Sequence, residues 1–172
     1  MKPVVILIED LFNEHELLYP YYRVQEAGYP ALLTGPEARV YKSKAGLAMR
    51  AEAAAGEVDP KEVLGLVVPG GYAPDRLRRH KEVLDLVRAV DAAKKPIAAI
   101  CHAGWVLISA GIVRGRRLTG YFSIKDDLIN AGAIFLDEAP VVDGNLVTAR
   151  GPGDVPRWLP PFLELLGQAG SA

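Results

Sequence analysis

Cysteine and histidine are scarce in this chain, which has one Cys and three His among 172 residues. A single cysteine excludes a disulfide bond within the chain and is typical of proteins from reducing compartments, so we expect a cytoplasmic protein. Zinc sites require Cys or His pairs two to four positions apart, and His15, His80, Cys101 and His102 offer no such pair. We therefore expect no metal.

Long basic runs and long apolar runs are also missing. The net charge is −1, with 50% apolar and 24% charged residues, so neither nucleic acid nor an anionic membrane is an expected partner. The N-terminal apolar run, residues 3–8, meets Glu9 and Asp10 too early for a signal peptide or a membrane span. No phosphate-binding or dinucleotide fingerprint is present, so we expect no nucleotide and no other cofactor.

Apolar runs of strand length alternate with segments of helical spacing. This alternation predicts a single α/β domain over residues 1–172, with a doubly wound, mostly parallel sheet sandwiched by helices in a flavodoxin-like, three-layer arrangement. The predicted strands are 3–8, 30–34, 64–68 and 97–100, and the predicted helices are 14–27, 81–94, 123–130 (capped by Ser123) and 155–166. Hairpins are predicted at 39–52, outside the main sheet, and at 141–147, with a turn at Asp143-Gly144.

The only cysteine stands where an apolar run ends and an amphipathic segment begins. Residues 97–100 predict a strand, and the amphipathic segment that follows, within the stretch ending at Gly111, predicts a helix, so Cys101 lies at the turn between them. Ala99 and Ala103 are small enough for strand and helix to pass closely, as a nucleophile elbow requires. A helix start favours a thiolate, so we expect a reactive Cys101. The alternative is a buried structural cysteine.

Three unusual segments follow predicted strands: 11–16, 69–75 and 101–102. Ligands of parallel sheets collect at the carboxyl ends of the strands, so these segments are expected to form one site. Gly70 and Gly71 are candidate oxyanion donors, with the backbone N–H of His102 as another; the alternative is an ordinary turn. The His102 ring can act as a base or a cationic partner if a further group orients it. His15 and His80 are expected to face solvent.

Four motifs occur in order along the chain: EHELLYP at 14–20, VPGGYAPD at 68–75, ICH at 100–102 and IKDDLINAG at 124–132. In this combination the chain resembles the PfpI-type intracellular proteases, which belong to the DJ superfamily and are related in fold to class I glutamine amidotransferase domains. The resemblance extends from about residue 3 to residue 166.

The resemblance implies roles for five residues. Cys101 would be the nucleophile, and Glu16 would hydrogen-bond its sulfur and help to set its ionisation. His102 would pair with Cys101, and Asp75 would reach it from a neighbouring subunit of a homo-oligomer to complete a triad. The family has Glu at this last position, so the acid here is one methylene shorter. Tyr121 would lie at the pocket rim, or else in the core.

The expected activity is therefore that of a cysteine hydrolase of the intracellular protease I type, with a thiolate attacking an electrophilic carbonyl. Small dicarbonyls, glycated compounds (a glyoxalase or deglycase activity) and peptides are all possible substrates, and we expect the small-molecule activity to exceed the peptidase activity. The alternative is a non-enzymatic redox-sensing or chaperone-like stress protein that uses the same cysteine. The helix start, Glu16 and His102 are all expected to lower the pKa of Cys101.

Overall fold

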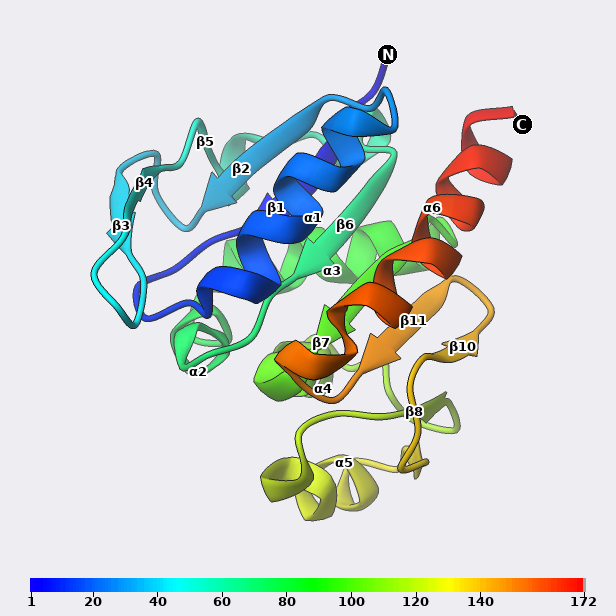
Figure 1. Cartoon of the computed structure of the whole chain (residues 1–172). Coiled ribbons are helices and arrows are strands. Elements are labelled where there is room, and N and C mark those ends of the chain that lie inside the picture. The colour runs from blue at the N-terminus through cyan, green and yellow to red at the C-terminus, as the bar shows by residue number, and fades with distance from the viewer. Residues whose placement is uncertain (172) are drawn as a thin grey trace.

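A seven-stranded sheet runs through the centre of the computed structural model, which describes residues 1–171 (Figure 1). The strands lie in the order β10-β11-β7-β6-β1-β2-β5, and all neighbours are parallel except β10 and β11. This sheet confirms the predicted α/β fold; of the expected domain 1–172, Ala172 lies outside the described residues. The strands are β1 Val4–Leu7, β2 Ala31–Gly35, β5 Ala53–Ala54, β6 Gly65–Val68, β7 Ile97–Ile100, β10 Val141–Asp143 and β11 Leu146–Ala149.

Helices cover both faces of this sheet (Figure 1). The apolar side chains of α1 Glu14–Glu26 and α6 Val155–Ser171 share one core cluster with one face of the strands. The opposite face packs against α2 Ala73–Leu77, α3 Lys81–Ala92, α4 Gly104–Ala110 and α5 Lys125–Asn130. The predicted three-layer arrangement is therefore confirmed. No helix among residues 1–171 combines the length and the apolar character needed to cross a membrane.

Strand β1 shows why the central strands have continuous apolar sequences. Val4 and Ile6 join the cluster beneath α1 and α6, whereas Val5 and Leu7 join the opposite cluster. All four side chains are fully buried. Because successive side chains of a strand point to opposite faces, a strand covered on both sides must be apolar throughout.

Small elements lie outside the main sheet. The predicted hairpin within 39–52 is confirmed as β3 Val40–Lys42 and β4 Ala48–Arg50, which are antiparallel. A short parallel pair, β8 Arg117–Leu118 and β9 Ile134–Phe135, was not expected from the sequence, and neither were β5 and α2. Single 3-10 turns occupy residues 55–57, 60–62, 101–103, 122–124 and 152–154.

The predicted end of the last helix and the predicted turn of the second hairpin are wrong. Helix α6 continues to Ser171 rather than ending near 166, although Pro160 and Pro161 lie inside it. Its Trp158 and Phe162 are fully buried, and burial of each large side chain stabilises the helix by roughly 1.5–3 kcal/mol, which offsets hydrogen bonds lost at the prolines. In the second hairpin Asp143 pairs with Leu146, so the two turn residues are 144 and 145 rather than Asp-Gly.

Candidate active site

The carboxyl edge of the sheet brings together the loops that follow β1, β6 and β7. The first two are joined by backbone hydrogen bonds, in which Asn13 N–H donates to the Gly70 carbonyl (3.2 Å) and Tyr72 N–H donates to the Leu11 carbonyl (2.9 Å). Gly71 adopts a φ of +83°, and a Cβ there would lie 2.6 Å from the Leu11 oxygen. Glycine at position 71 is required for this close approach, which lets the loop after β6 pack against the loop before α1.

Cys101 begins a 3-10 turn directly after β7 and adopts a φ of 62°, in the left-handed region. A residue other than glycine is held in this conformation at a cost of about 1–3 kcal/mol, which the surrounding structure must impose. Ala99 and Ala103 are buried on either side of the turn. The expected strand, sharp turn and helix are confirmed, and the turn leaves 8% of Cys101 exposed.

Glu16 lies in the first turn of α1, fully buried. The Asn13 side chain caps the helix by accepting a hydrogen bond from Glu16 N–H (3.2 Å), which fixes the start of the helix. Glu16 Oε1 accepts the Gly70 N–H (2.9 Å), while its buried Oε2 has no hydrogen-bond partner among the described residues. The expected hydrogen bond between Glu16 and the Cys101 sulfur is therefore wrong for this structure. Burial raises the pKa of Glu16 to about 7, so the carboxyl is partly protonated at neutral pH.

The Gly70 N–H is thus engaged by Glu16, and the expectation that it serves as a free oxyanion donor is wrong for this structure. Gly70 has a packing role instead. A Cβ there would lie 2.6 Å from Cys101 Cβ and 3.0 Å from the Ile100 oxygen, and would also meet Glu16 Oε1. The missing side chain lets the nucleophile and the acid lie against the same backbone.

The expected lowering of the Cys101 pKa is also wrong. Burial, the largest cause, and the negative charge of Glu16 raise this pKa to about 12, although the backbone N–H groups of Gly71 and His102 act in the opposite direction by hydrogen-bonding the sulfur. Cys101 is therefore a thiol at rest. These two N–H groups stay as candidate oxyanion donors, since both already lie at the sulfur.

The His102 ring is held at both nitrogens. Its Nδ1 lies 3.1 Å from Cys101 Sγ, and its Nε2 lies 3.2 Å from Ser123 Oγ. The rings of Trp105 and Tyr121 flank it, with centroids 5.0 and 4.9 Å away. Burial, and secondarily the positive charge of Lys44, lower the pKa of His102, so the ring is a neutral imidazole at pH 7.

Asp75 lies on α2 and forms an ion pair with Arg79 of the next helical turn. The hydrogen bond that Arg79 donates within this ion pair is the main reason why the pKa of Asp75 is lowered. Among residues 1–171, the side-chain atoms that hydrogen-bond the His102 ring belong to Cys101 and Ser123. An approach of Asp75 to His102 across a subunit interface involves a second chain and stays a prediction.

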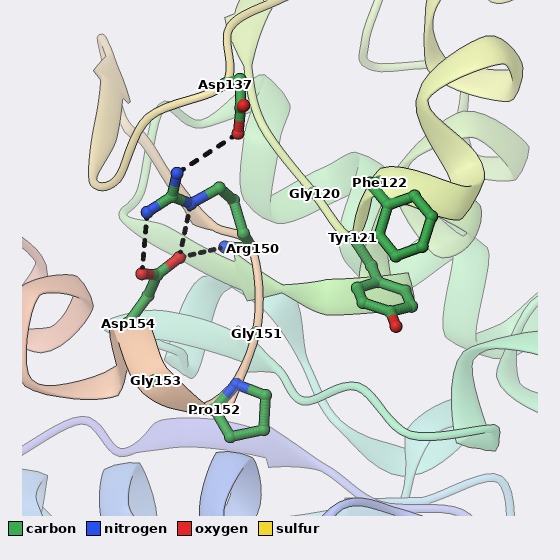
Figure 2. A pocket seen from close by; sticks show the side chains of 9 residues that line it. All are labelled: Gly120, Tyr121, Phe122, Asp137, Arg150, Gly151, Pro152, Gly153 and Asp154. Atoms are coloured by element: carbon green, nitrogen blue, oxygen red, sulfur yellow. Dashed lines mark hydrogen bonds and ion pairs between the residues drawn. The ribbon is translucent and has the colours of Figure 1, made fainter.

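A cavity of about 310 Å³ has Tyr121 in its lining, and Figure 2 shows the residues that line it. Tyr121 connects this cavity to Cys101 and His102, because its ring contacts the His102 ring at an interplanar angle of 46°, its N–H donates to the Cys101 carbonyl (3.1 Å) and it lines the cavity. Tyr121 is 37% exposed, which places it at a rim rather than in the core. The cavity is lined by Gly120, Tyr121, Phe122, Asp137, Arg150, Gly151, Pro152, Gly153 and Asp154.

Charges in this cavity are already paired. Figure 2 shows the Arg150 guanidinium between two carboxylates, and it donates to Asp154 (2.9 and 3.1 Å) and to Asp137 (3.2 Å). With Tyr121 and Phe122 on the other side, the cavity offers aromatic surface and backbone more than a free charge. In the described part of the chain, no group of three or more Cys, His, Asp or Glu residues is arranged to hold a metal ion.

Ser123 was missed as a site residue. The sequence predicts it as the cap of a helix, but the cap of α5 is Ile124, and no side chain caps this helix. Ser123 belongs to the preceding 3-10 turn, residues 122–124, where its hydroxyl faces His102. No local sequence pattern predicts the contact between Ser123 and His102, because the two residues are 21 positions apart.

Comparison with known proteins gives consistent matches. Residues 2–165 match the model of the DJ-1/PfpI family. A deglycase of Pyrococcus abyssi is 44% identical over 163 residues, or 95% of this chain and 98% of that protein, and the deglycase PfpI of Pyrococcus furiosus is 40% identical over the same shares. A two-domain protein of Anabaena variabilis with DJ-1/ThiJ/PfpI-like and ferritin-like domains superposes with a TM-score of 0.95 at 38% identity, over 99% of this chain and 50% of that one.

Proposed function

Because the chain belongs to the DJ-1/PfpI family, we propose that it is a cysteine-dependent enzyme whose Cys101 adds to the carbonyl of a small dicarbonyl, or to a glycated amine or thiol derived from one. The names of the two archaeal relatives, both deglycases, support this chemistry. Peptide hydrolysis, which uses the same nucleophile, is the weaker activity in this proposal.

One contact carries the proposal: Cys101 Sγ lies 3.1 Å from His102 Nδ1. The raised pKa of the thiol and the lowered pKa of the imidazole favour the neutral form of both groups at neutral pH, so the resting nucleophile is a thiol rather than a thiolate. It can attack when its proton passes to Nδ1 at the same time, which makes His102 a general base. The geometry for that transfer exists within one chain.

The addition step balances without any outside reagent. As the S–C bond forms, the thiol proton moves to His102, and the carbonyl π electrons move to oxygen. The alkoxide then takes this proton from the imidazolium, leaving a hemithioacetal and a neutral ring. On a glycated amine, the S–C bond replaces the N–C bond and the proton leaves on the amine.

The hemithioacetal of a dicarbonyl can then rearrange. Loss of the proton on the former aldehyde carbon and protonation of the ketone oxygen give an enediol. Protonation of the second carbon and loss of the hydroxyl proton on the first then leave a thioester beside an alcohol, so the first carbon is oxidised and the second is reduced. Water hydrolyses the thioester to a 2-hydroxy acid and returns the thiol. Glu16, half-ionised near pH 7 and buried beside the sulfur, is the acid or base at hand for the proton shift.

The test compares methylglyoxal, an amine glycated with methylglyoxal and a fluorogenic peptide on one preparation, each against Cys101→Ser. Conversion of methylglyoxal to lactate, and release of the free amine, both abolished by Cys101→Ser, are expected. Peptide cleavage that requires Cys101, without any turnover of the other two substrates, would make the chain a peptidase and overturn the proposal.

The competing hypothesis is a redox sensor in which Cys101 oxidises reversibly. It requires no turnover of carbonyls but a peroxide-dependent gain of mass at Cys101, reversed by a thiol reductant at the sulfenate stage. Mass spectrometry of peroxide-treated protein, run beside the turnover assay, separates the two hypotheses. Reversible oxidation with no carbonyl turnover would favour the sensor.

A further inference from the structure

Ser123 is carried on a segment that is fixed to the cysteine turn. Tyr121 N–H donates to the Cys101 carbonyl (3.1 Å), and Ile124 N–H donates to the Tyr121 carbonyl (3.0 Å). The Ile124 side chain is buried below the segment, whereas Ser123 itself is exposed. The hydroxyl is therefore held at the edge of the site by its backbone, and its removal leaves the core packing unchanged.

The two hydrogen bonds of His102 determine which nitrogen carries its proton. In the Nε2–H tautomer, Nδ1 is free to accept from the Cys101 thiol, but that weak donor favours this tautomer only in part. That Nε2–H lies 3.2 Å from Ser123 Oγ, which can accept it. In the opposite tautomer Nδ1–H would face the thiol and could not remove its proton.

We propose that Ser123 is a positioning residue that holds His102 in the Nε2–H tautomer, so that one chain contains a complete Cys101–His102–Ser123 relay. This inference rests on the proposed function, in which His102 accepts the thiol proton. It differs from the expectation that a partner's carboxylate orients the ring, since in this chain Asp75 is already paired with Arg79.

A hydroxyl suits both stages of the proposed addition. It accepts from Nε2–H while the ring is neutral, and it still accepts after Nδ1 has taken the thiol proton. Unlike a carboxylate, it adds no charge that would hold the ring as an imidazolium. Of the other titratable groups near the site, Lys44 and Glu16 act on His102 or on the Cys101 sulfur through their charge, and Tyr121 contacts the ring face. Among residues 1–171 the hydrogen-bond partner of Nε2 is the Ser123 hydroxyl.

The tautomer can be observed directly by ¹⁵N NMR, because the chain has only three histidines. The wild type, Ser123→Ala, Ser123→Thr and the matched control Ser171→Ala are compared near pH 8, with the His102 signal assigned by Asn replacement of each histidine. Nε2–H is expected to dominate in the wild type, Ser171→Ala and Ser123→Thr. Ser123→Ala is expected to give a mixture of both tautomers.

Kinetics provide the second measurement. Loss of one net hydrogen bond predicts a fall in kcat for methylglyoxal of between about twofold and tenfold in Ser123→Ala, with Thr restoring the rate. An unchanged His102 spectrum in Ser123→Ala would overturn the proposal. If Asp75→Asn changed the spectrum in that case, the carboxylate of Asp75 would be the orienting group instead. Since the spectra require no turnover, failure of the proposed function would be recognised separately by a wild type that is inactive on every carbonyl.

Discussion

Glu16→Gln is expected to change how stability depends on pH. Burial raises the pKa of Glu16 from an ordinary 4.5 to about 7, so between these values the folded chain keeps a proton that the unfolded chain has lost. The free energy of unfolding therefore falls as pH rises through this window. One pKa unit corresponds to about 1.4 kcal/mol, so the total fall from this group is about 3 kcal/mol.

Gln keeps the shape of the protonated carboxyl, and its oxygen can still accept the Gly70 N–H. The variant lacks the titrating proton, so its stability relative to the wild type is expected to rise by about 3 kcal/mol between pH 4.5 and 8. Urea unfolding at half-unit pH intervals measures this difference. The control is Glu14→Gln in the same helical turn, because the Glu14 pKa is lowered and its contribution changes only below pH 4.5. Parallel curves for the wild type and Glu16→Gln would refute the reasoning.

Two further predictions concern the same loops. The rate at which iodoacetamide alkylates Cys101 should rise with pH with a midpoint above the free-thiol pKa of about 8.5. Glu16→Gln should lower that midpoint pH, because it removes a negative charge beside the sulfur. Cys101→Ser gives the background rate, and a wild-type midpoint below about 8.5 would contradict the burial argument. Gly70→Ala should destabilise the chain by about 1–3 kcal/mol in urea, since its Cβ would lie 2.6 Å from Cys101 Cβ. Gly151→Ala is the control, because nothing lies within 4 Å of its Cβ, and equal stability of the two variants would show that the loop can shift.

The fold was predictable because its central strands are covered on both faces. Residues 3–8, 64–68 and 97–100 stand out as apolar runs for that reason, and β1, β6 and β7 lie side by side in the sheet. The position of Cys101 followed from the same pattern, since a strand that ends at the carboxyl edge delivers its next residue to the site. Helical spacing likewise identified α1 and α3, whose apolar faces are buried.

The protonation of the site was not predictable, because it depends on burial and on contacts between distant segments. A cysteine at a helix start favours a lowered pKa when it is solvated, yet Cys101 is 8% exposed and shares its surroundings with Glu16. The Gly70 N–H, which we expected to bind an oxyanion, instead donates a hydrogen bond to the carboxyl of Glu16, 54 positions earlier in the chain. Neither effect leaves a signal in local sequence.

The pKa directions bear on the choice between aldehyde and peptide substrates. Burial lowers the pKa of His102, so the imidazolium formed when it takes the thiol proton is a stronger acid than an exposed imidazolium and gives the proton up more readily. Formation of a hemithioacetal requires this proton in the next step, when the imidazolium protonates the alkoxide oxygen on the carbon that Cys101 has attacked. Cleavage of a peptide requires the proton to reach the leaving nitrogen, which departs only after a tetrahedral intermediate has formed. The His102 imidazolium must persist during that interval, and a neutral Ser123 does little to stabilise it. In the proposed mechanism, a thiol, a weakly basic ring and a neutral orienting group would therefore favour reversible addition to an activated carbonyl over cleavage of an amide.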